Sequence, residues 1–101
     1  MSIESEVSQD GKTLTITIRG RFDFGSHQAF RDTYEHFYKK PEVYVVDLKD
    51  TTYMDSSALG MLLLLRDYAG GERAQVQVIN SNNDVRKILA ISNFDKLFDI
   101  S

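Results

Sequence analysis

An acid and two hydroxyls stand side by side in the segment Thr52–Leu65, where Asp55, Ser56 and Ser57 follow one another. All three residue types are favoured at helix N-caps, because a short side-chain oxygen accepts a hydrogen bond from a free N–H of the first turn. One cap is enough for a helix, so at least one of the two serines is available for a second role. The alternative is a polar junction that does nothing except cap the helix.

The segments on both sides of this junction must position it. Val43–Leu48 is almost continuously apolar and β-branched, which predicts a strand covered on both faces. The leucine-rich segment after the junction predicts a helix to about Ala69, ended by Gly70 and Gly71. The junction therefore lies at the carboxyl end of a strand, where ligands and partners of α/β sheets commonly bind.

The start of the chain predicts a β-hairpin followed by a sharp bend. Ile3–Val7 and Thr13–Arg19 alternate between apolar and polar residues around the turn signal Asp10-Gly11. The segment Gly20–Gly25 then places two aromatic residues and Asp23 between two glycines, which indicates a bend. We expect this bend to lie near the Asp55 junction.

The remaining pattern alternates helices and strands. Ser26 is the expected N-cap of a helix from His27 to about Lys39, with its apolar side on the core. Gln75–Ile79 predicts a strand, the segment from Val85 to Ile91 a short helix, and Lys96–Ile100 a final strand. We therefore expect one α/β domain over residues 1–101, with a mixed β-sheet, an N-terminal hairpin and helices packed on the sheet.

Composition excludes several classes of protein. The chain has no cysteine and only two histidines, His27 and His36, so we expect no metal site and no cofactor. The net charge is −3 and the longest basic cluster is Lys39-Lys40, which argues against nucleic acid as a partner. The acidic start lacks the pattern of a signal peptide, and the apolar run Ala58–Leu65 is too short for a membrane helix. These features predict a cytoplasmic protein, a monomer or a weak dimer.

Three stretches together resemble a known family. Gly20–Asp23 after the hairpin, Val46–Leu48 at the end of the apolar strand, and Met54–Gly60 at the junction are similar to the STAS domain of bacterial anti-sigma factor antagonists. The resemblance covers nearly the whole chain, and its most specific part is Asp-Ser-Ser-x-x-Gly. It implies a STAS-like fold.

The resemblance also implies a function. Members of the family bind an anti-sigma factor, often a serine kinase, and so release a sigma factor; the kinase phosphorylates a serine before the second helix and a phosphatase reverses this. The matching phosphoacceptor in this chain is Ser56, beside Asp55, with Asp23 as the acid of the neighbouring loop. Two departures are Ala58, where glycine is common, and the absence of a helix after the last strand. A partner contact made by that helix cannot be carried over.

The expected partner surface surrounds Ser56. Asp23 either contacts a partner or braces its own turn, and of Phe22 and Phe24 one is expected in the core and the other exposed. On the leucine helix, Leu59, Leu62 and Leu63 are expected to face the core, and Met61 and Leu64 to form an exposed patch; the alternative is a helix buried nearly all round. The complete set of expected partner-binding residues is Asp23, Phe24, Asp55, Ser57, Met61 and Leu64.

Two other functions were weighed. A serine enzyme needs a base within hydrogen-bond reach. We expect His27 to be a solvated histidine in the first turn of its helix and His36 to lie far from the junction, so we expect no enzyme. A STAS module could also serve as a scaffold, a subunit of a transport complex or a small-ligand sensor, because fold does not fix function.

Overall fold

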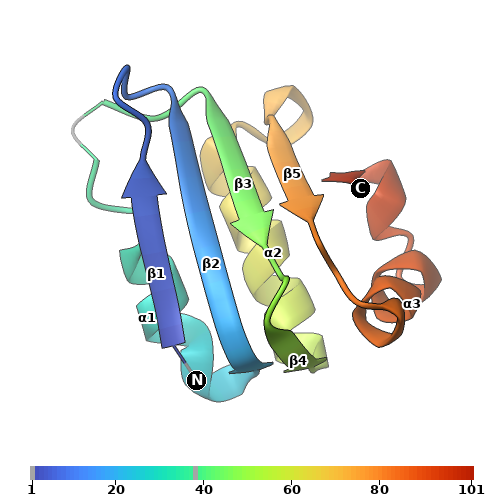
Figure 1. The fold of residues 1–101 in the computed structure, drawn as a ribbon. Coiled ribbons are helices and arrows are strands. Elements are labelled where there is room, and N and C mark those ends of the chain that lie inside the picture. Colours follow the sequence, from blue (N-terminus) through green and yellow to red (C-terminus); the bar gives the residue numbers. More distant parts are fainter. Residues whose placement is uncertain (1, 38) are drawn as a thin grey trace.

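A mixed β-sheet organises the chain (Figure 1). The computed structural model describes residues 2–37 and 39–101. Within them the strands are β1 (Ser2–Val7), β2 (Thr13–Phe22), β3 (Val43–Asp47), β4 (Thr51–Met54), β5 (Val76–Ile79) and β6 (Asp99–Ile100). The order is β1-β2-β3-β5-β6, and β4 pairs with the end of β2. Strand β1 is antiparallel to β2, and the other pairs are parallel.

Two helices cover one face of this sheet. Helices α1 (His27–Asp32) and α2 (Ser56–Ala69) lie behind it in Figure 1, and α3 (Asn83–Ile91) lies beyond β5. Short 3-10 turns occupy Phe24–Ser26, Gly71–Arg73 and Phe94–Lys96. The predicted α/β fold, with an N-terminal hairpin and helices on a mixed sheet, is confirmed.

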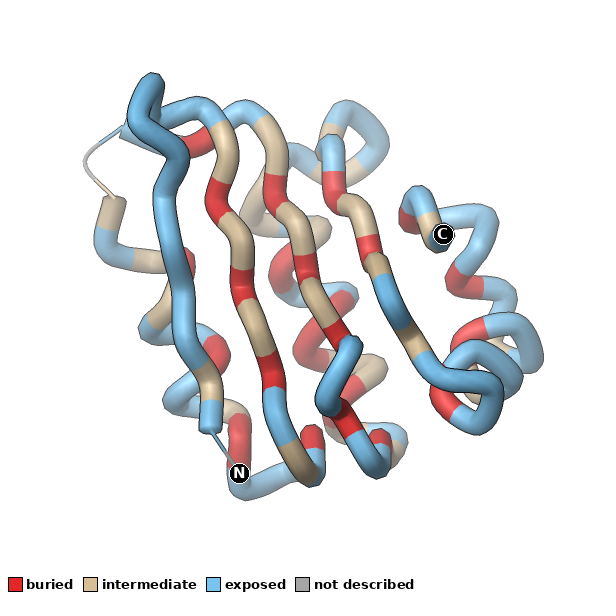
Figure 2. Tube along the Cα trace, viewed as in Figure 1, coloured by how far each residue is buried: buried red, intermediate tan, exposed pale blue. Residues whose placement is uncertain are grey.

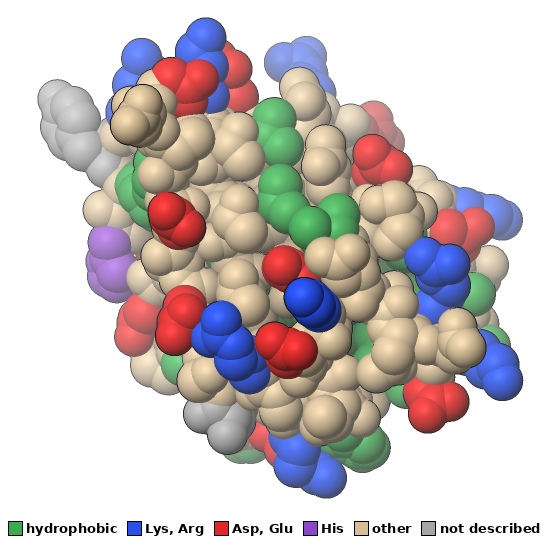
Figure 3. Space-filling model, in the orientation of Figure 1, with side chains coloured by type: hydrophobic (Ala, Val, Ile, Leu, Met, Phe, Trp, Pro, Cys, Tyr) green, Lys and Arg blue, Asp and Glu red, His purple; other side chains and the backbone are tan. Residues whose placement is uncertain are grey.

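The two central strands bury alternate residues (Figure 2). In β3, Tyr44 and Val46 are buried against the helices, whereas Val43 and Val45 are half-buried on the other face. The prediction that Val43–Leu48 is covered on both faces is therefore wrong. Figure 1 shows no helix over this other face of the sheet, and Figure 3 shows the side chains of the molecule from the same side. Valine is favoured here because branched side chains suit a pleated, half-buried surface.

The strands differ most from the prediction at the end of β2, in β4 and in the final strand. Strand β2 continues beyond Arg19 to Phe22, because its last residues pair with β4, which the sequence did not predict. The final strand is only Asp99–Ile100, since Phe94–Lys96 forms a 3-10 turn. The rings of Phe94 and Phe98 stack at 5.3 Å, and both are buried. The stacked rings of Phe94 and Phe98 thus lie where the final strand was expected to begin.

Helix α1 ends at Asp32, so the expected helix to Lys39 is too long. The hydroxyl of Thr33 donates to the carbonyl of Phe30 at 2.6 Å, and the Thr33 N–H donates to the same oxygen at 3.1 Å. A threonine hydroxyl that bonds the preceding turn competes with the helical pattern. Of the three aromatic residues expected on the apolar side of this helix, Phe30 and Tyr34 are buried, and Phe37 is half-buried against the core. The expected helix also includes Tyr38, which lies outside the described residues.

The hydroxyl of Tyr44 allows a stability test. Tyr44 is buried, and its hydroxyl has no hydrogen-bond partner among the described residues. A buried polar group without a partner costs about 1–3 kcal/mol relative to a satisfied one. We therefore expect Tyr44→Phe to leave the free energy of unfolding unchanged or to raise it by about 1 kcal/mol in urea unfolding. A clear loss of stability would show that the hydroxyl has a partner.

The same residue predicts a dependence on pH. Burial raises the pKa of the Tyr44 phenol above its ordinary value. The unfolded chain therefore ionises Tyr44 first, and the stability linked to this residue is lost as the pH rises past about 10. We expect Tyr44→Phe to lose less stability than the native protein between about pH 9 and pH 11. Equal losses would contradict this.

Candidate functional site

Asp55 is the cap of α2. Its Oδ1 accepts a hydrogen bond from the Ala58 N–H at 2.9 Å, and its backbone is extended. Ser56 is the first residue of the helix and is exposed, whereas Ser57 is half-buried. Because Asp55 provides the cap, neither serine is needed for it. Ser56 is thus an exposed residue at the positive end of a helix, and its hydroxyl is not needed for the cap.

Asp55 also joins the junction to the preceding bend. Its Oδ2 accepts a hydrogen bond from the Phe24 N–H at 3.3 Å, and its own N–H donates to the carbonyl of Phe22 at 3.3 Å. Residues 31 positions apart in the chain therefore meet at the carboxyl edge of β2 and β4. The expected proximity of the two loops is confirmed.

Asp23 braces its own turn. Its Oδ1 accepts from the Gly25 N–H at 3.1 Å, while the Ser26 hydroxyl accepts from the Asp23 N–H at 3.3 Å. The Ser26 hydroxyl also donates to the Arg21 carbonyl at 3.4 Å. These bonds form a capping box on the 3-10 turn. Ser26 is the N-cap residue of α1 as predicted, but its side chain makes no cap hydrogen bond to that helix. The structure thus shows the bracing role of Asp23, and a partner contact stays a prediction.

The two phenylalanines of the bend point to opposite environments, as predicted. Phe22 is 0% exposed and its ring lies 5.1 Å from that of Phe30, whereas Phe24 is 76% exposed. The exposed ring stands on the turn that Asp55 holds. The surface beside Ser56 therefore carries a large apolar side chain.

Sequence reasoning missed a second exposed aromatic residue in this area. The Arg21 guanidinium lies over the Tyr53 ring at 4.1 Å, and Tyr53 is 42% exposed. The two residues are partners in the register of β2 and β4. Nothing in the sequence signalled this pair, because it depends on a strand that was not predicted.

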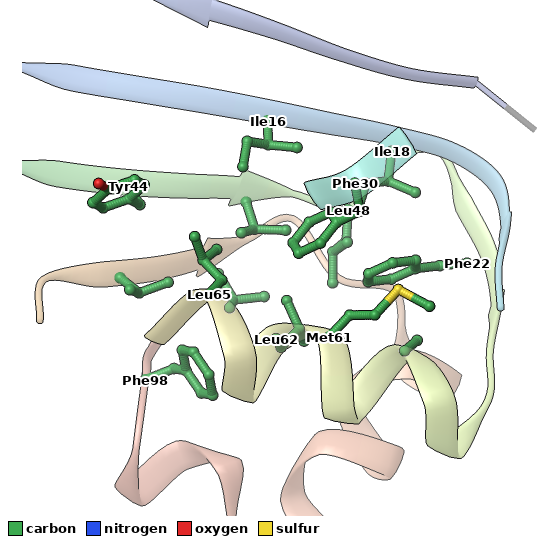
Figure 4. Close-up of a cluster of buried hydrophobic side chains, with 14 of the residues drawn as sticks. Ile16, Ile18, Phe22, Phe30, Tyr44, Leu48, Met61, Leu62, Leu65 and Phe98 are labelled. Carbon is green, nitrogen blue, oxygen red and sulfur yellow. The ribbon is translucent and has the colours of Figure 1, made fainter. Parts of the chain in front are cut away.

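Helix α2 exposes different residues from those expected. Met61 is 3% exposed and points into the core near Phe22 in Figure 4, so its expected place in an exposed patch is wrong. Leu64 is 51% exposed as expected, but Leu63, expected in the core, is 41% exposed. The residues that face the core are Ala58, Met61, Leu62 and Leu65, one position away from the predicted stripe. The structure therefore matches neither predicted arrangement of the helix: the exposed patch does not include Met61, and the helix is not buried nearly all round.

The described residues contain no group of three His, Cys, Asp or Glu side chains placed to hold a metal ion. The same part of the chain has no helix with the length and apolar character needed to cross a bilayer. His36 lies beside Asp32, at 3.5 Å, beyond the end of α1. Around the junction the structure places the Ser56 hydroxyl, the carboxylates of Asp23 and Asp55, the exposed Phe24 ring and the Arg21 guanidinium.

The double role of Asp55 gives a prediction. We expect Asp55→Ala to lower the free energy of unfolding by about 1–2 kcal/mol, because the cap and the bond to Phe24 are both lost. Asp67→Ala is the matched control, since Asp67 is exposed near the other end of α2 and should change stability by less than about 0.5 kcal/mol. Chemical denaturation measures both. Equal effects would contradict the assigned cap.

The fold and this junction define a class of protein: a small α/β domain with an exposed serine at the start of its longest helix. Comparison with known families narrows the class. A family model described as "Mlab, STAS domain" matches residues 5–99. The chain belongs to the STAS domain family. It is 63% identical to a STAS-domain containing protein of Pseudomonas aeruginosa over 101 residues, which is 100% of both chains.

Solved structures with this fold include SpoIIAA and a sulfate transporter family protein. The chain matches SpoIIAA of Bacillus in its phosphorylated form with a TM-score of 0.75 and 17% identity, covering 99% of this chain and 91% of that one. It matches a sulfate transporter family protein from Wolinella succinogenes with a TM-score of 0.75 and 15% identity, covering 94% and 81%. These similarities establish the fold, which the two proteins share.

Proposed function

We propose that this protein is an anti-sigma factor antagonist whose binding is switched by phosphorylation of Ser56. In the unphosphorylated form it binds a cytoplasmic anti-sigma factor that is also a serine kinase, and a sigma factor is released. The kinase ends this state by phosphorylating Ser56, and a serine phosphatase restores it. The observation that carries the proposal is the exposed Ser56 hydroxyl beside a carboxylate that already caps the helix.

The chemistry of the junction supports a switch that does not disturb the fold. A neutral hydroxyl is small enough to lie inside an interface, whereas a phosphate adds about −1.5 to −2 charges and three acceptor oxygens. The free N–H groups at the start of α2 favour an anion, so the domain itself tolerates the phosphate. A docked partner does not tolerate the phosphate, because the phosphate adds bulk and negative charge beside the carboxylate of Asp55.

The same junction supports a binding module in preference to an enzyme. A serine nucleophile needs a base within hydrogen-bond reach. Among the described residues no hydrogen bond joins either histidine to Ser56: His36 lies beside Asp32, and His27 is the first residue of α1, after the bend. SpoIIAA, which shares the fold, was solved as an anti-sigma factor antagonist in its unphosphorylated form and also in its phosphorylated form.

A STAS module in a transport complex is the second candidate, favoured by the match to the sulfate transporter family protein. A scaffold or a small-ligand sensor would use the same fold. The intact pair of Asp55 and Ser56 favours the phosphorylation switch over these roles. The partner that the protein binds separates the candidates.

Affinity capture with the Ser56→Ala variant tests the proposal. This variant cannot be phosphorylated at position 56 and should hold its partner. Mass spectrometry should identify a protein with a serine kinase domain, and that kinase with ATP should phosphorylate the native chain on Ser56. Capture of membrane transport components alone, or phosphate on another residue, would contradict the proposal.

A further inference from the structure

The side of α2 that faces away from the sheet is apolar. An α-helix turns about 100° per residue, so Ser56, Gly60, Leu63 and Asp67 lie nearly in one line. Leu64 flanks this line opposite the buried residues of the helix, whereas Leu59, on the other flank, packs partly against the core. Leu63 and Leu64 are exposed, and Leu59 and Gly60 are half-buried.

A helix on the surface of a soluble domain normally carries polar residues on its outer side. Helix α3 carries the charged residues Asp84, Arg86 and Lys87 on its exposed side, with Ile91 as an exposed apolar residue at its last position. Helix α2 departs from this rule over the two turns that follow Ser56. The residues Gly60, Leu63 and Leu64 on the outer side of α2 form the outer stripe. Apolar residues gathered in this way mark an interaction surface.

Gly60 gives an independent reason to expect close contact at the outer stripe. Glycine inside a helix is less stable than alanine by about 0.5–1 kcal/mol. A Cβ atom built on Gly60 meets no heavy atom within 4 Å, so packing among the described residues does not require glycine there. A missing side chain at this point lets another backbone approach the helix closely.

The outer stripe borders a groove whose charge helps to define the occupant. The groove between α1 and α2 has a volume of about 230 Å³ and is lined by Arg31, Tyr34, Glu35, Leu64, Asp67 and Tyr68. The Arg31 guanidinium is paired with Glu35. Among the described residues no cation forms an ion pair with Asp67, which is exposed one turn beyond Leu63. Lys40 lies at the edge of this groove, over the Tyr68 ring at 4.2 Å. Among the described residues that line the groove, Asp67 is thus the charged side chain without an ion pair, and a basic residue of a partner complements it.

We infer that the outer stripe docks an amphipathic helix of the partner protein. The apolar side of that helix lies over Gly60 and against Leu63 and Leu64, and a lysine or arginine beyond it meets Asp67. The distance from Ser56 to Asp67 along α2 is about 16 Å, equal to three turns of helix. This inference rests on the proposed function, because Ser56 then lies at one end of the docked helix.

Site-specific photo-crosslinking tests the occupant. The full-length protein carries p-benzoylphenylalanine at position 64, at position 24 beside the switch, or at position 91. Ile91 is 81% exposed on α3 and is the matched apolar control. We expect positions 24 and 64 to crosslink the same protein in cells. The peptide attached at position 64 should come from an amphipathic helix with a lysine or arginine.

Each other outcome has a defined meaning. Crosslinking from position 24 without position 64 overturns the docked helix and leaves the proposed function intact. If position 64 crosslinks a second copy of this chain, the inference that a helix of another protein docks on the outer stripe is wrong. Failure at both positions contradicts the inference and the proposed function together.

Surface variants test the same contact with the purified crosslinked partner. We expect Leu63→Gln combined with Leu64→Gln to weaken binding at least tenfold with an unchanged melting temperature, and Ile91→Gln to change neither. Gly60→Ala should raise the melting temperature by about 4 °C and still weaken binding. Native affinity in the Gly60→Ala variant would overturn the close approach at Gly60.

Discussion

Replacing Phe22 by alanine is expected to destabilise the domain by about 3–5 kcal/mol, whereas Phe24→Ala should change stability by less than about 0.5 kcal/mol. Phe22 is fully buried against Phe30, and Figure 4 places it beside Met61. Its removal leaves a cavity where the bend, α1 and α2 meet. Phe24 stands in solvent, so its removal opens no cavity.

Urea unfolding followed by circular dichroism measures this pair. A domain of this size typically has a stability of 5–15 kcal/mol, so Phe22→Ala removes a large part of it. Phe24→Ala serves as the matched control, because it deletes the same atoms two residues away. Because Phe24 belongs to the proposed partner surface, we expect Phe24→Ala to weaken partner binding without unfolding the protein. Similar stability losses in both variants would contradict the assigned orientation of the bend.

A negative charge at position 56 is the second change with a large expected effect. We expect Ser56→Asp to weaken partner binding at least about 100-fold, since an unpaired charge buried in an interface costs several kcal/mol. The fold should be unaffected, because an acid in the first turn of α2 is favourable to the helix. Titration of the purified partner into each variant measures the loss.

Ser56→Asn is the matched control for this charge. Asparagine has nearly the size of aspartate and is neutral, so it should retain binding within about tenfold of the native protein. Ser56→Ala should bind at least as well as Ser56→Asn. Equal losses of affinity for Ser56→Asp and Ser56→Asn would show that the size of the side chain alone weakens binding. Native affinity in Ser56→Asp would show that a negative charge at position 56 does not weaken binding.

Local signals in the sequence predicted the parts of the fold that depend on neighbouring residues. The alternation around Asp10-Gly11 predicted the hairpin, and Gly70 ends α2 with a positive φ of 127° as expected. The polar junction predicted a capped helix, and the order of strands and helices brought the Asp23 loop to it. These features follow from turn chemistry, capping and short connections.

The remaining features depend on contacts that are distant in the sequence. Strand β4 exists because Thr51–Met54 pairs with the end of β2, and four residues give too little periodicity to reveal this. In α2 nearly every residue from Ala58 to Leu65 is apolar, so the sequence could not decide which side faces the core. Packing against Phe22 buries Met61 and leaves Leu63 outside. A helix with polar residues on one side, such as α3, does not have this ambiguity.

The most direct test of the account compares the protein carrying phosphoserine at position 56 with the unmodified protein. Calorimetric titration gives the dissociation constant for the captured kinase, and thermal unfolding gives the melting temperature of the same samples. The account predicts a loss of affinity of at least about 100-fold with a melting temperature that stays within a few degrees. An unchanged dissociation constant at full phosphorylation of Ser56 would contradict it.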